Sequence, residues 1–230
     1  MKRFYESAEA RAVEGGYEVS LDGRPVRTPG RQKLTFPSVK LAEASAAEWS
    51  AQGETLDMAA MPLTALSYAT LDRIAEDPGR FVDDVTRFAE TDLLCYRAPT
   101  PAKLVARQAG AWDPLLAWLL ERYGARLILA EGIMPVEQPE SAIAAIRQAF
   151  AALDPFRLTA AHVASQAAGS AVIALALVEG EITPTTAADA AQIDDDWQLE
   201  QWGEDEEARE LMVRRRSDLE EIGHFLALLE

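Results

Sequence analysis

Four groups of side chains have residue types that could support chemistry. His162, one of only two histidines, could act as a general base. Asp194, Asp195 and Asp196 could bind a divalent cation, because hard cations prefer carboxylate oxygens. Cys95, the single cysteine, could be a nucleophilic thiol, and the three arginines at 214–216 could bind an anion. Each group also has a structural explanation.

The sequence around each group favours that structural explanation. His162 lies among alanines, with no recognisable nucleophile for it to activate. Consecutive helical residues point about 100° apart, so the three aspartates should form a solvated acidic face and not converge on one ion. Cys95 lies in an apolar run and should be a small buried hydrophobe. The arginines at 214–216 have acidic neighbours for pairing four residues away on a helix: Glu210, Asp218 and Glu220.

Several catalytic motifs are absent from the sequence. It has no Gly-x-x-x-x-Gly-Lys-Ser/Thr phosphate loop, no dinucleotide-binding fingerprint and no Gly-x-Ser-x-Gly nucleophile elbow. One cysteine and two histidines argue against a zinc site, and a single cysteine forms no intramolecular disulfide. We therefore expect no enzymatic activity, no cofactor and no metal. The alternative left open is an enzyme that uses His162 or the Asp194–Asp196 cluster.

The net charge of the 230-residue chain is −16 and is unevenly distributed. Residues 1–40 carry eight Lys/Arg and five Asp/Glu, a net charge of +3, so the remaining residues carry −19. So negative a surface repels phosphate backbones and anionic lipid, which disfavours nucleic acid and membrane as partners. The expected partner is another protein.

The N-terminus lacks the apolar stretch of a secretory signal. The longest apolar run, Ala171–Val178, is far shorter than the roughly 20 residues of a membrane span. We expect a soluble protein of the bacterial cytoplasm, although a processed protein of the mitochondrial matrix would look the same.

The first forty residues are expected to form β structure. Tyr17, Val19 and Leu21 alternate with polar residues, which is typical of a half-buried strand. Asp22-Gly23 follows and predicts a type I′ hairpin turn. Residues 24–27 then form a second strand, placed at an edge or next to a bulge because Pro25 cannot donate to a ladder. Residues 34–36 form a third.

Helices are expected after Pro37, with Ser38 as the N-cap of the first and Met61-Pro62 opening the second. The apolar segment 92–96 is either a buried strand returning to the sheet or a helix end. The two prolines at 99 and 101 mark a boundary. Beyond it, helices are expected at 103–108, 113–123, 140–152, 157–166, 168–178, 185–202 and 205–229, with short strands possible within 126–133. The sequence thus predicts an α+β protein with a small β-rich N-terminal domain at 1–98 and a larger helical domain at 99–230.

Two of the five tryptophans lie at helix ends. Trp49 precedes a polar segment that ends in Gly53, and Trp202 is followed by Gly203. Both remain open to two interpretations. They are either part of the core or exposed anchors of the kind that dominate protein interfaces.

Several strings in the sequence occur together and in order. They are Arg3-Phe4-Tyr5, the segment 17–29, Ala47–Gln52, Met61–Thr64, Thr91–Arg97, Trp112–Leu115, Gly169-Ser170 and Trp202-Gly203-Glu204-Asp205. Each string alone is weak, but the ordered set is specific and spans nearly the whole chain. With these strings the chain resembles the mitochondrial and alphaproteobacterial family of assembly chaperones that act on the α subunit of F1-ATP synthase.

The resemblance implies a non-enzymatic function. Family members bind the unassembled F1 α subunit, prevent its aggregation and release it to the β subunit as the hexamer forms. The resemblance also gives functional weight to Trp49 and Glu204, and it implies a monomer when free. The candidate partner-binding residues all lie in the strings above: Trp49, Trp202, Glu204, Asp205, Arg24 and Met61. An adaptor for another oligomeric enzyme is a further alternative.

Overall fold

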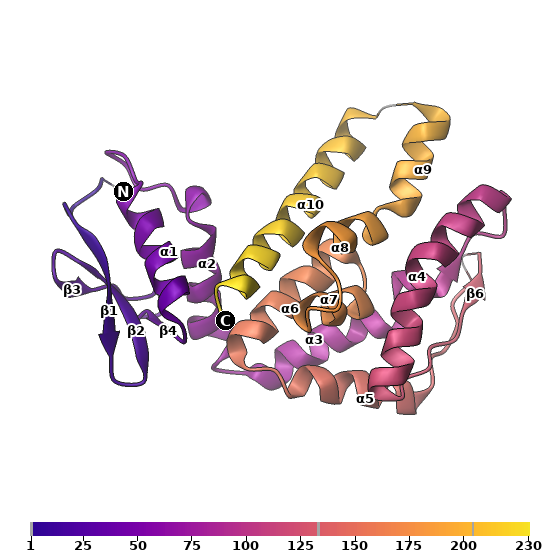
Figure 1. The fold of residues 1–230 in the computed structure, drawn as a ribbon, viewed down its shortest axis with the longest axis horizontal. Coiled ribbons are helices and arrows are strands. Elements are labelled where there is room, and N and C mark those ends of the chain that lie inside the picture. The colour runs from indigo at the N-terminus through magenta and orange to yellow at the C-terminus, as the bar shows by residue number, and fades with distance from the viewer. Residues whose placement is uncertain (1, 133, 204) are drawn as a thin grey trace. The chain divides into compact units, whose positions relative to one another are not determined.

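The structure is a computed structural model of the 230-residue chain, and it describes residues 2–132, 134–203 and 205–230. The chain forms two compact units (Figure 1). Unit one comprises residues 1–78 and 224–230, and unit two comprises residues 79–223. A small strand-containing N-terminal part followed by a mostly helical part confirms the predicted α+β class. The expected domain boundary at 98/99 falls inside unit two, and as a limit between independently folding domains it stays a prediction.

The sheet of unit one is organised around one central strand, β2 (Gly16–Leu21). Along its length β2 pairs antiparallel with β1 (Ala8–Val13), and it also pairs with β3 (Arg24–Pro25) and β4 (Thr35–Phe36). The predicted hairpin turn is confirmed, because Asp22 and Gly23 have φ of 47° and 78°, as a type I′ turn requires. Pro25 lies in an edge strand, as expected. Strand β1 is not evident in the sequence pattern, because alanine has little preference for strands.

The helical part of unit one covers this sheet. Helix α1 (Val39–Ser50) packs on β1 and β2 (Figure 1), and the predicted N-cap is confirmed by a hydrogen bond from Leu41 N to Ser38 Oγ. The following short elements are η1 (Met58–Ala60), α2 (Pro62–Ala69) and the π-helical turn η2 (Thr70–Ile74). The carboxylate of Glu48 accepts from Leu63 N and Thr64 N, both at 2.8 Å, which fixes the N-terminus of α2 against α1.

Unit two is almost entirely helical. Its elements are α3 (Pro78–Glu90), η3 (Leu93–Cys95), β5 (Tyr96–Arg97), α4 (Ala102–Tyr123), β6 (Ala130–Glu131), α5 (Glu140–Ala151), α6 (Pro155–Ala168), α7 (Ala171–Val178), α8 (Pro184–Ala191), α9 (Ile193–Trp202) and α10 (Glu206–Ala227), whose last four residues belong to unit one. All eight residues of α7 are buried, so this short apolar helix is the centre of the core. No helix in the described part of the chain is long and apolar enough to cross a membrane.

Several element predictions for unit two need correction. The segment 92–96 does not return to the N-terminal sheet, since η3 leads into β5, which pairs in parallel with β6. The expected helices at 103–108 and 113–123 form the single helix α4, because Pro114 removes only one backbone hydrogen bond and its neighbours keep the helix intact. The expected helix at 185–202 is divided at Gln192 into α8 and α9.

The expected helix at 168–178 begins later, at Ala171, because Gly169-Ser170 is the junction between α6 and α7. Gly169 has φ of 64° and ends α6, and no atom lies within 4 Å of a Cβ built on it. Ser170 accepts from Ile173 N at 3.0 Å and caps α7. The hydroxyl of Ser170 donates to the fully buried carboxylate of Asp92 at 2.7 Å. Asp92 therefore joins η3 to the start of α7.

Candidate partner-binding site

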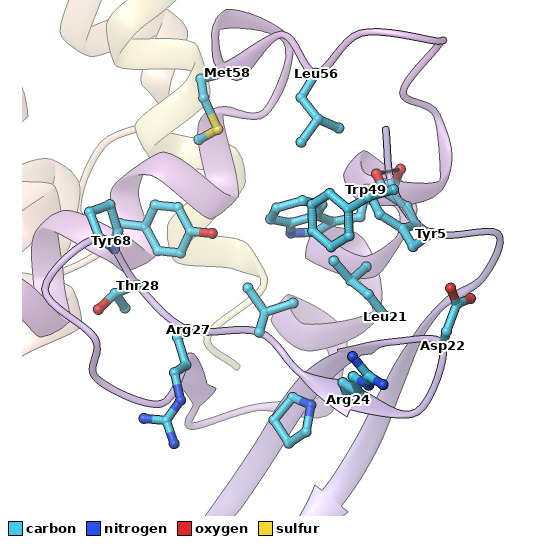
Figure 2. Close-up of a pocket in the computed structure, with 14 residues that line it drawn as sticks. Tyr5, Leu21, Asp22, Arg24, Arg27, Thr28, Trp49, Leu56, Met58 and Tyr68 are labelled. Atoms are coloured by element: carbon cyan, nitrogen blue, oxygen red, sulfur yellow. Dashed lines mark hydrogen bonds between the residues drawn. The ribbon is translucent and has the colours of Figure 1, made fainter. Parts of the chain in front are cut away.

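A hollow of about 850 Å³ opens on the surface of unit one (Figure 2). Its walls come from the N-terminal segment, from the loop that follows β3, from the end of α1 and from the segment before α2. Most of its lining is apolar: Phe4, Tyr5, Leu21, Pro25, Val26, Pro29, Trp49, Leu56, Met58 and Tyr68. A concave, mostly apolar site with a few polar groups has the character of a binding site.

Trp49 forms part of the wall from the end of α1. Its side chain is 5% exposed, and its ring lies edge-on to that of Tyr5 with centroids 5.7 Å apart. The hydroxyl of Tyr5 donates to the backbone carbonyl of Trp49 at 2.7 Å, which ties the N-terminal segment to α1. Within the described part of the chain, the indole Nε1 of Trp49 is buried and has no hydrogen-bond partner. An unpaired buried donor is costly, so this nitrogen is of functional interest.

Charged side chains line the hollow at the β3 end. Arg24 and Arg27 are exposed there, and no ion pair engages either of them among the described residues. Asp22 is occupied, because its carboxylate accepts from the backbone amides of Glu6 and Ser7. These hydrogen bonds stabilise the charged form and hold the pKa of Asp22 below its ordinary value. Two arginines against the one carboxylate of Asp22, which also interacts with Arg24, leave this end with a net positive charge that favours a negatively charged ligand group.

The loop that carries this wall is held by Asp72. Its carboxylate accepts from the hydroxyl of Thr28 and from Gly30 N, the latter at 2.7 Å. A Cβ at Gly30 would lie 2.6 Å from Asp72 Oδ1, so only glycine allows this approach. Tyr68, one helical turn before Asp72, points its hydroxyl toward Trp49 in Figure 2. Burial, with a smaller contribution from the negative charge of Asp72, raises the pKa of Tyr68 to about 12, so the phenol stays protonated as a donor.

The structure brings together two of the residues proposed from the sequence, because Trp49 and Arg24 line the same hollow. Met61 does not line it and is fully buried. Sequence analysis missed Arg27, Met58 and Tyr68, which carry no distinguishing pattern and reach the hollow only through the fold. Phe4 belongs to the Arg3-Phe4-Tyr5 string, and its 64% exposure is not predictable from its residue type.

A second set of proposed residues lies in unit two, where α9 ends and α10 begins. The ring of Trp202 is 78% exposed, so this residue is not part of the core, and its role as a partner anchor stays a prediction. Asp205 is exposed, and its Oδ1 accepts from Glu207 N at 3.0 Å and caps α10. Glu204 lies outside the described residues. Leu211 and Val213, farther along α10, are also exposed apolar side chains.

The side chains first considered for catalysis and metal binding are engaged in structural contacts. His162 lies edge-on to Phe81, with ring centroids 5.1 Å apart. Asp194 accepts from Gln108 Nε2 at 2.7 Å, while Asp195 pairs with Arg215 at 3.4 Å, so these aspartates face different partners. No cluster of three or more His, Cys, Asp or Glu side chains suited to a metal ion occurs in residues 2–132, 134–203 and 205–230.

The arginines at 214–216 only partly follow the expected pairing. Arg214 pairs with Glu210 four residues away at 3.5 Å, as expected. Arg216 instead pairs across to Asp189 of α8 at 2.6 Å. The expectation of pairing within the helix is thus wrong for Arg216 and Arg215, because neighbouring helices bring acids closer than the helix itself does. Cys95 is fully buried, and desolvation raises the pKa of its thiol to about 12, which makes it unreactive.

The fold and these surfaces define a two-unit α+β protein with exposed apolar side chains. The family model of the ATP12 chaperone protein matches residues 2–120, and the chain belongs to this family of assembly chaperones. Two solved structures agree over the whole chain. The crystal structure of Atp12 from Paracoccus denitrificans has 38% identity and a TM-score of 0.95, covering 100% of this chain and 98% of that one. A protein from Agrobacterium tumefaciens has 43% identity and a TM-score of 0.92, covering 100% of this chain and 86% of that one.

A more distant relative comes from a eukaryote. The mitochondrial protein atp12 of Schizosaccharomyces pombe is 23% identical over 222 residues, which cover 91% of this chain and 76% of the relative. The predicted family is therefore confirmed.

Proposed function

We propose that this protein is a holding chaperone for the unassembled α subunit of F1-ATP synthase. It binds the subunit, prevents its aggregation and gives way to the β subunit during hexamer assembly. The proposal extends the family membership to a particular client. It also carries forward a non-enzymatic function, a monomeric free state and a location in the bacterial cytoplasm or its mitochondrial equivalent.

The observation that carries the proposal is the exposed ring of Trp202 at the C-terminal end of α9, shortly before the acidic first turn of α10. Because the Trp202 ring is 78% exposed, it contributes little of the folding free energy that burial of a tryptophan ring would give. Exposed tryptophans are frequent anchors of protein interfaces. Leu211 and Val213 are further exposed apolar side chains on α10.

The physical mechanism is the covering of an apolar patch. A free α subunit exposes the surface that it will later bury against β, and such patches drive aggregation. A chaperone that covers the patch more weakly than β does can be displaced by β without consuming energy. The net charge of −16 keeps the complex soluble and complements a basic client surface.

The test mixes purified α subunit with this protein and follows aggregation by light scattering. We expect suppression by the wild type, and weaker suppression by Trp202→Ala and by Glu204→Lys. Leu129→Ala and Glu181→Lys, which change exposed residues outside this segment, are the matched controls. Full aggregation in the presence of the wild type would reject the proposal. Suppression that is equal in Glu204→Lys would reject the role of that residue.

The release step and the choice of client are tested separately. Adding β subunit to the preformed complex should transfer α into α–β assemblies. Capture from a lysate should yield α as the dominant partner. A different oligomeric enzyme as the dominant partner would instead support the adaptor alternative.

A further inference from the structure

We propose that the hollow beside Trp49 binds an extended client segment in which an apolar side chain is flanked by an acidic one. The inference rests on the proposed function only for the identity of the client. The recognition itself is argued from the lining of the hollow in unit one.

Apolar side chains are exposed at the edge of the hollow. Phe4 is 64% exposed and Met58 is 43% exposed, and both line the hollow. Figure 2 shows Met58 and Leu56 on the side opposite Arg24 and Arg27. A volume of about 850 Å³ is at the upper end of the range of ligand sites, which accommodates more than one side chain. The burial of an apolar client side chain here would remove several exposed apolar surfaces from water at once.

The hydrogen-bond donors of Trp49 and Tyr68 also lie at the hollow. The indole Nε1 of Trp49 is buried and unpaired within the described part of the chain, although the ring as a whole lines the hollow. The hydroxyl of Tyr68 points toward the same space. Backbone carbonyls of an extended segment are suitable acceptors for such donors, since no secondary structure within the segment pairs them. The indole nitrogen of Trp49 is covered in the structure without a client. A client carbonyl can therefore reach it only after a side chain that lines the hollow moves. Phe4, which is 64% exposed, is more exposed than Met58 and is a candidate for this movement.

The charged side chains of the lining favour an acidic client residue. Arg24 and Arg27 are exposed at the β3 end of the hollow, while the carboxylate of Asp22 is occupied by backbone amides. The first forty residues carry a net +3, in contrast to the −19 of the remainder. An acidic client residue beside the apolar one would therefore find its complement here and be repelled elsewhere.

Binding by strand addition does not fit this edge of the sheet. Strand β3 has only two residues, and one of them is Pro25, which has no N–H to offer a new strand. Recognition would therefore come from the side chains of the hollow and from the Trp49 and Tyr68 donors. Recognition through side chains requires a particular client sequence, whereas strand addition would accept any extended backbone.

The experiment selects ligands from a random peptide display library on the immobilised full-length protein. A selected peptide and its variants are then measured by fluorescence polarisation. We expect selected sequences to pair Asp or Glu with a neighbouring Leu, Phe or Met. Arg24→Glu combined with Arg27→Glu should weaken binding at least tenfold. The matched double variant Lys33→Glu with Lys40→Glu changes the charge equally outside the hollow and should weaken it less than twofold.

Two further measurements keep the result interpretable. Trp49→Phe, which keeps a ring but removes the N–H, should weaken binding several-fold while the fold persists by circular dichroism. If the glutamate variants fail to fold, Arg24→Gln with Arg27→Gln replaces them with the same expected direction. Selected peptides without acidic residues, or equal losses in both charge variants, would overturn the proposal. So would competition by inorganic phosphate alone, which would indicate a simple anion site. Self-association of the protein that Arg24→Glu with Arg27→Glu abolishes would also overturn it, because it would indicate a second copy as the occupant.

The same variants separate this inference from the proposed function. If the selected peptide binds as expected but the α subunit is neither bound nor protected, the proposed peptide recognition by the hollow is supported and the α subunit is rejected as the client. If the Arg24/Arg27 variant protects the α subunit as well as the wild type does, the α subunit is supported as the client and the hollow is rejected as its binding site.

Discussion

The hydroxyl of Tyr5 donates a 2.7 Å hydrogen bond to the backbone carbonyl oxygen of Trp49. This contact joins the N-terminal segment to the end of α1, at the wall of the hollow in unit one. Because the ring of Trp49 also packs edge-on against Tyr5, the position of the indole depends on the N-terminal segment. The hollow is thus assembled from parts of the chain that are more than forty residues apart.

Tyr5→Phe should destabilise unit one without removing apolar surface. It leaves the buried carbonyl of Trp49 with one partner fewer, at a cost of about 1–2 kcal/mol in the free energy of unfolding. Urea denaturation of wild type and variant, with an unchanged m-value, measures the difference. An identical midpoint in both proteins would contradict the structural role assigned to this hydrogen bond.

Trp49→Phe and Trp112→Phe should differ in their effects on stability, although both rings are buried. Trp112 Nε1 donates to the carbonyl of Ala190 at 2.8 Å, whereas Trp49 Nε1 has no partner in the described part of the chain. Removal of the paired donor loses a hydrogen bond and orphans a carbonyl, while removal of the unpaired one relieves a desolvated group. We expect Trp112→Phe to cost about 1–2 kcal/mol more than Trp49→Phe, measured by chemical denaturation. The reverse order would show that ring packing, and not the indole N–H, decides the outcome.

Asp92 should make stability depend on pH in a direction unusual for an aspartate. Complete burial raises its pKa to about 6, against the opposing hydrogen bonds from Ser170, Leu94 and Val172. Because the pKa in the folded state is above that in the unfolded state, its contribution to stability is present below pH 4 and lost as the pH rises through about 6. A shift of about two pH units corresponds to about 3 kcal/mol.

The contribution of Asp92 is isolated by comparison with Asp92→Asn, which does not titrate. The free energy of unfolding of the wild type, relative to that of the variant, should fall between pH 4 and pH 7. Subtraction of the two curves cancels the titration of the other carboxylates. A constant difference across this range, or one that grows with pH, would show that the carboxylate is stabilised in its charged form.

Gly223→Ala and Gly110→Ala should change stability in opposite directions, although both glycines lie within helices. A Cβ at Gly223 would lie 2.0 Å from Pro184 Cγ at the start of α8, so α10 would have to move away. A Cβ at Gly110 meets no atom within 4 Å. Alanine favours the helix over glycine by about 0.5–1 kcal/mol, so Gly110→Ala should raise the melting temperature. Gly223→Ala should lower it, and an increase in its melting temperature would contradict the close approach of α8 and α10.

The features that the sequence determined by itself are those that depend on local geometry. Asp22 and Gly23 adopt the positive φ of a type I′ turn because their own steric preferences allow it. Ser38 caps α1 through an atom only three residues from its partner. The ordered strings that carry the family resemblance are likewise visible without coordinates, as was the α+β class.

Only the tertiary structure decided which side chains meet. Arg216 pairs with Asp189 across helices, and Met61 is buried while Phe4 is exposed, because these outcomes depend on contacts between distant parts of the chain. Pro114 does not end α4, since packing of the helix outweighs a single lost backbone hydrogen bond. Trp49 and Arg24, twenty-five residues apart, come to line one hollow for the same reason. Sequence preferences act over a few residues, whereas the burial of apolar surface is settled by the whole fold.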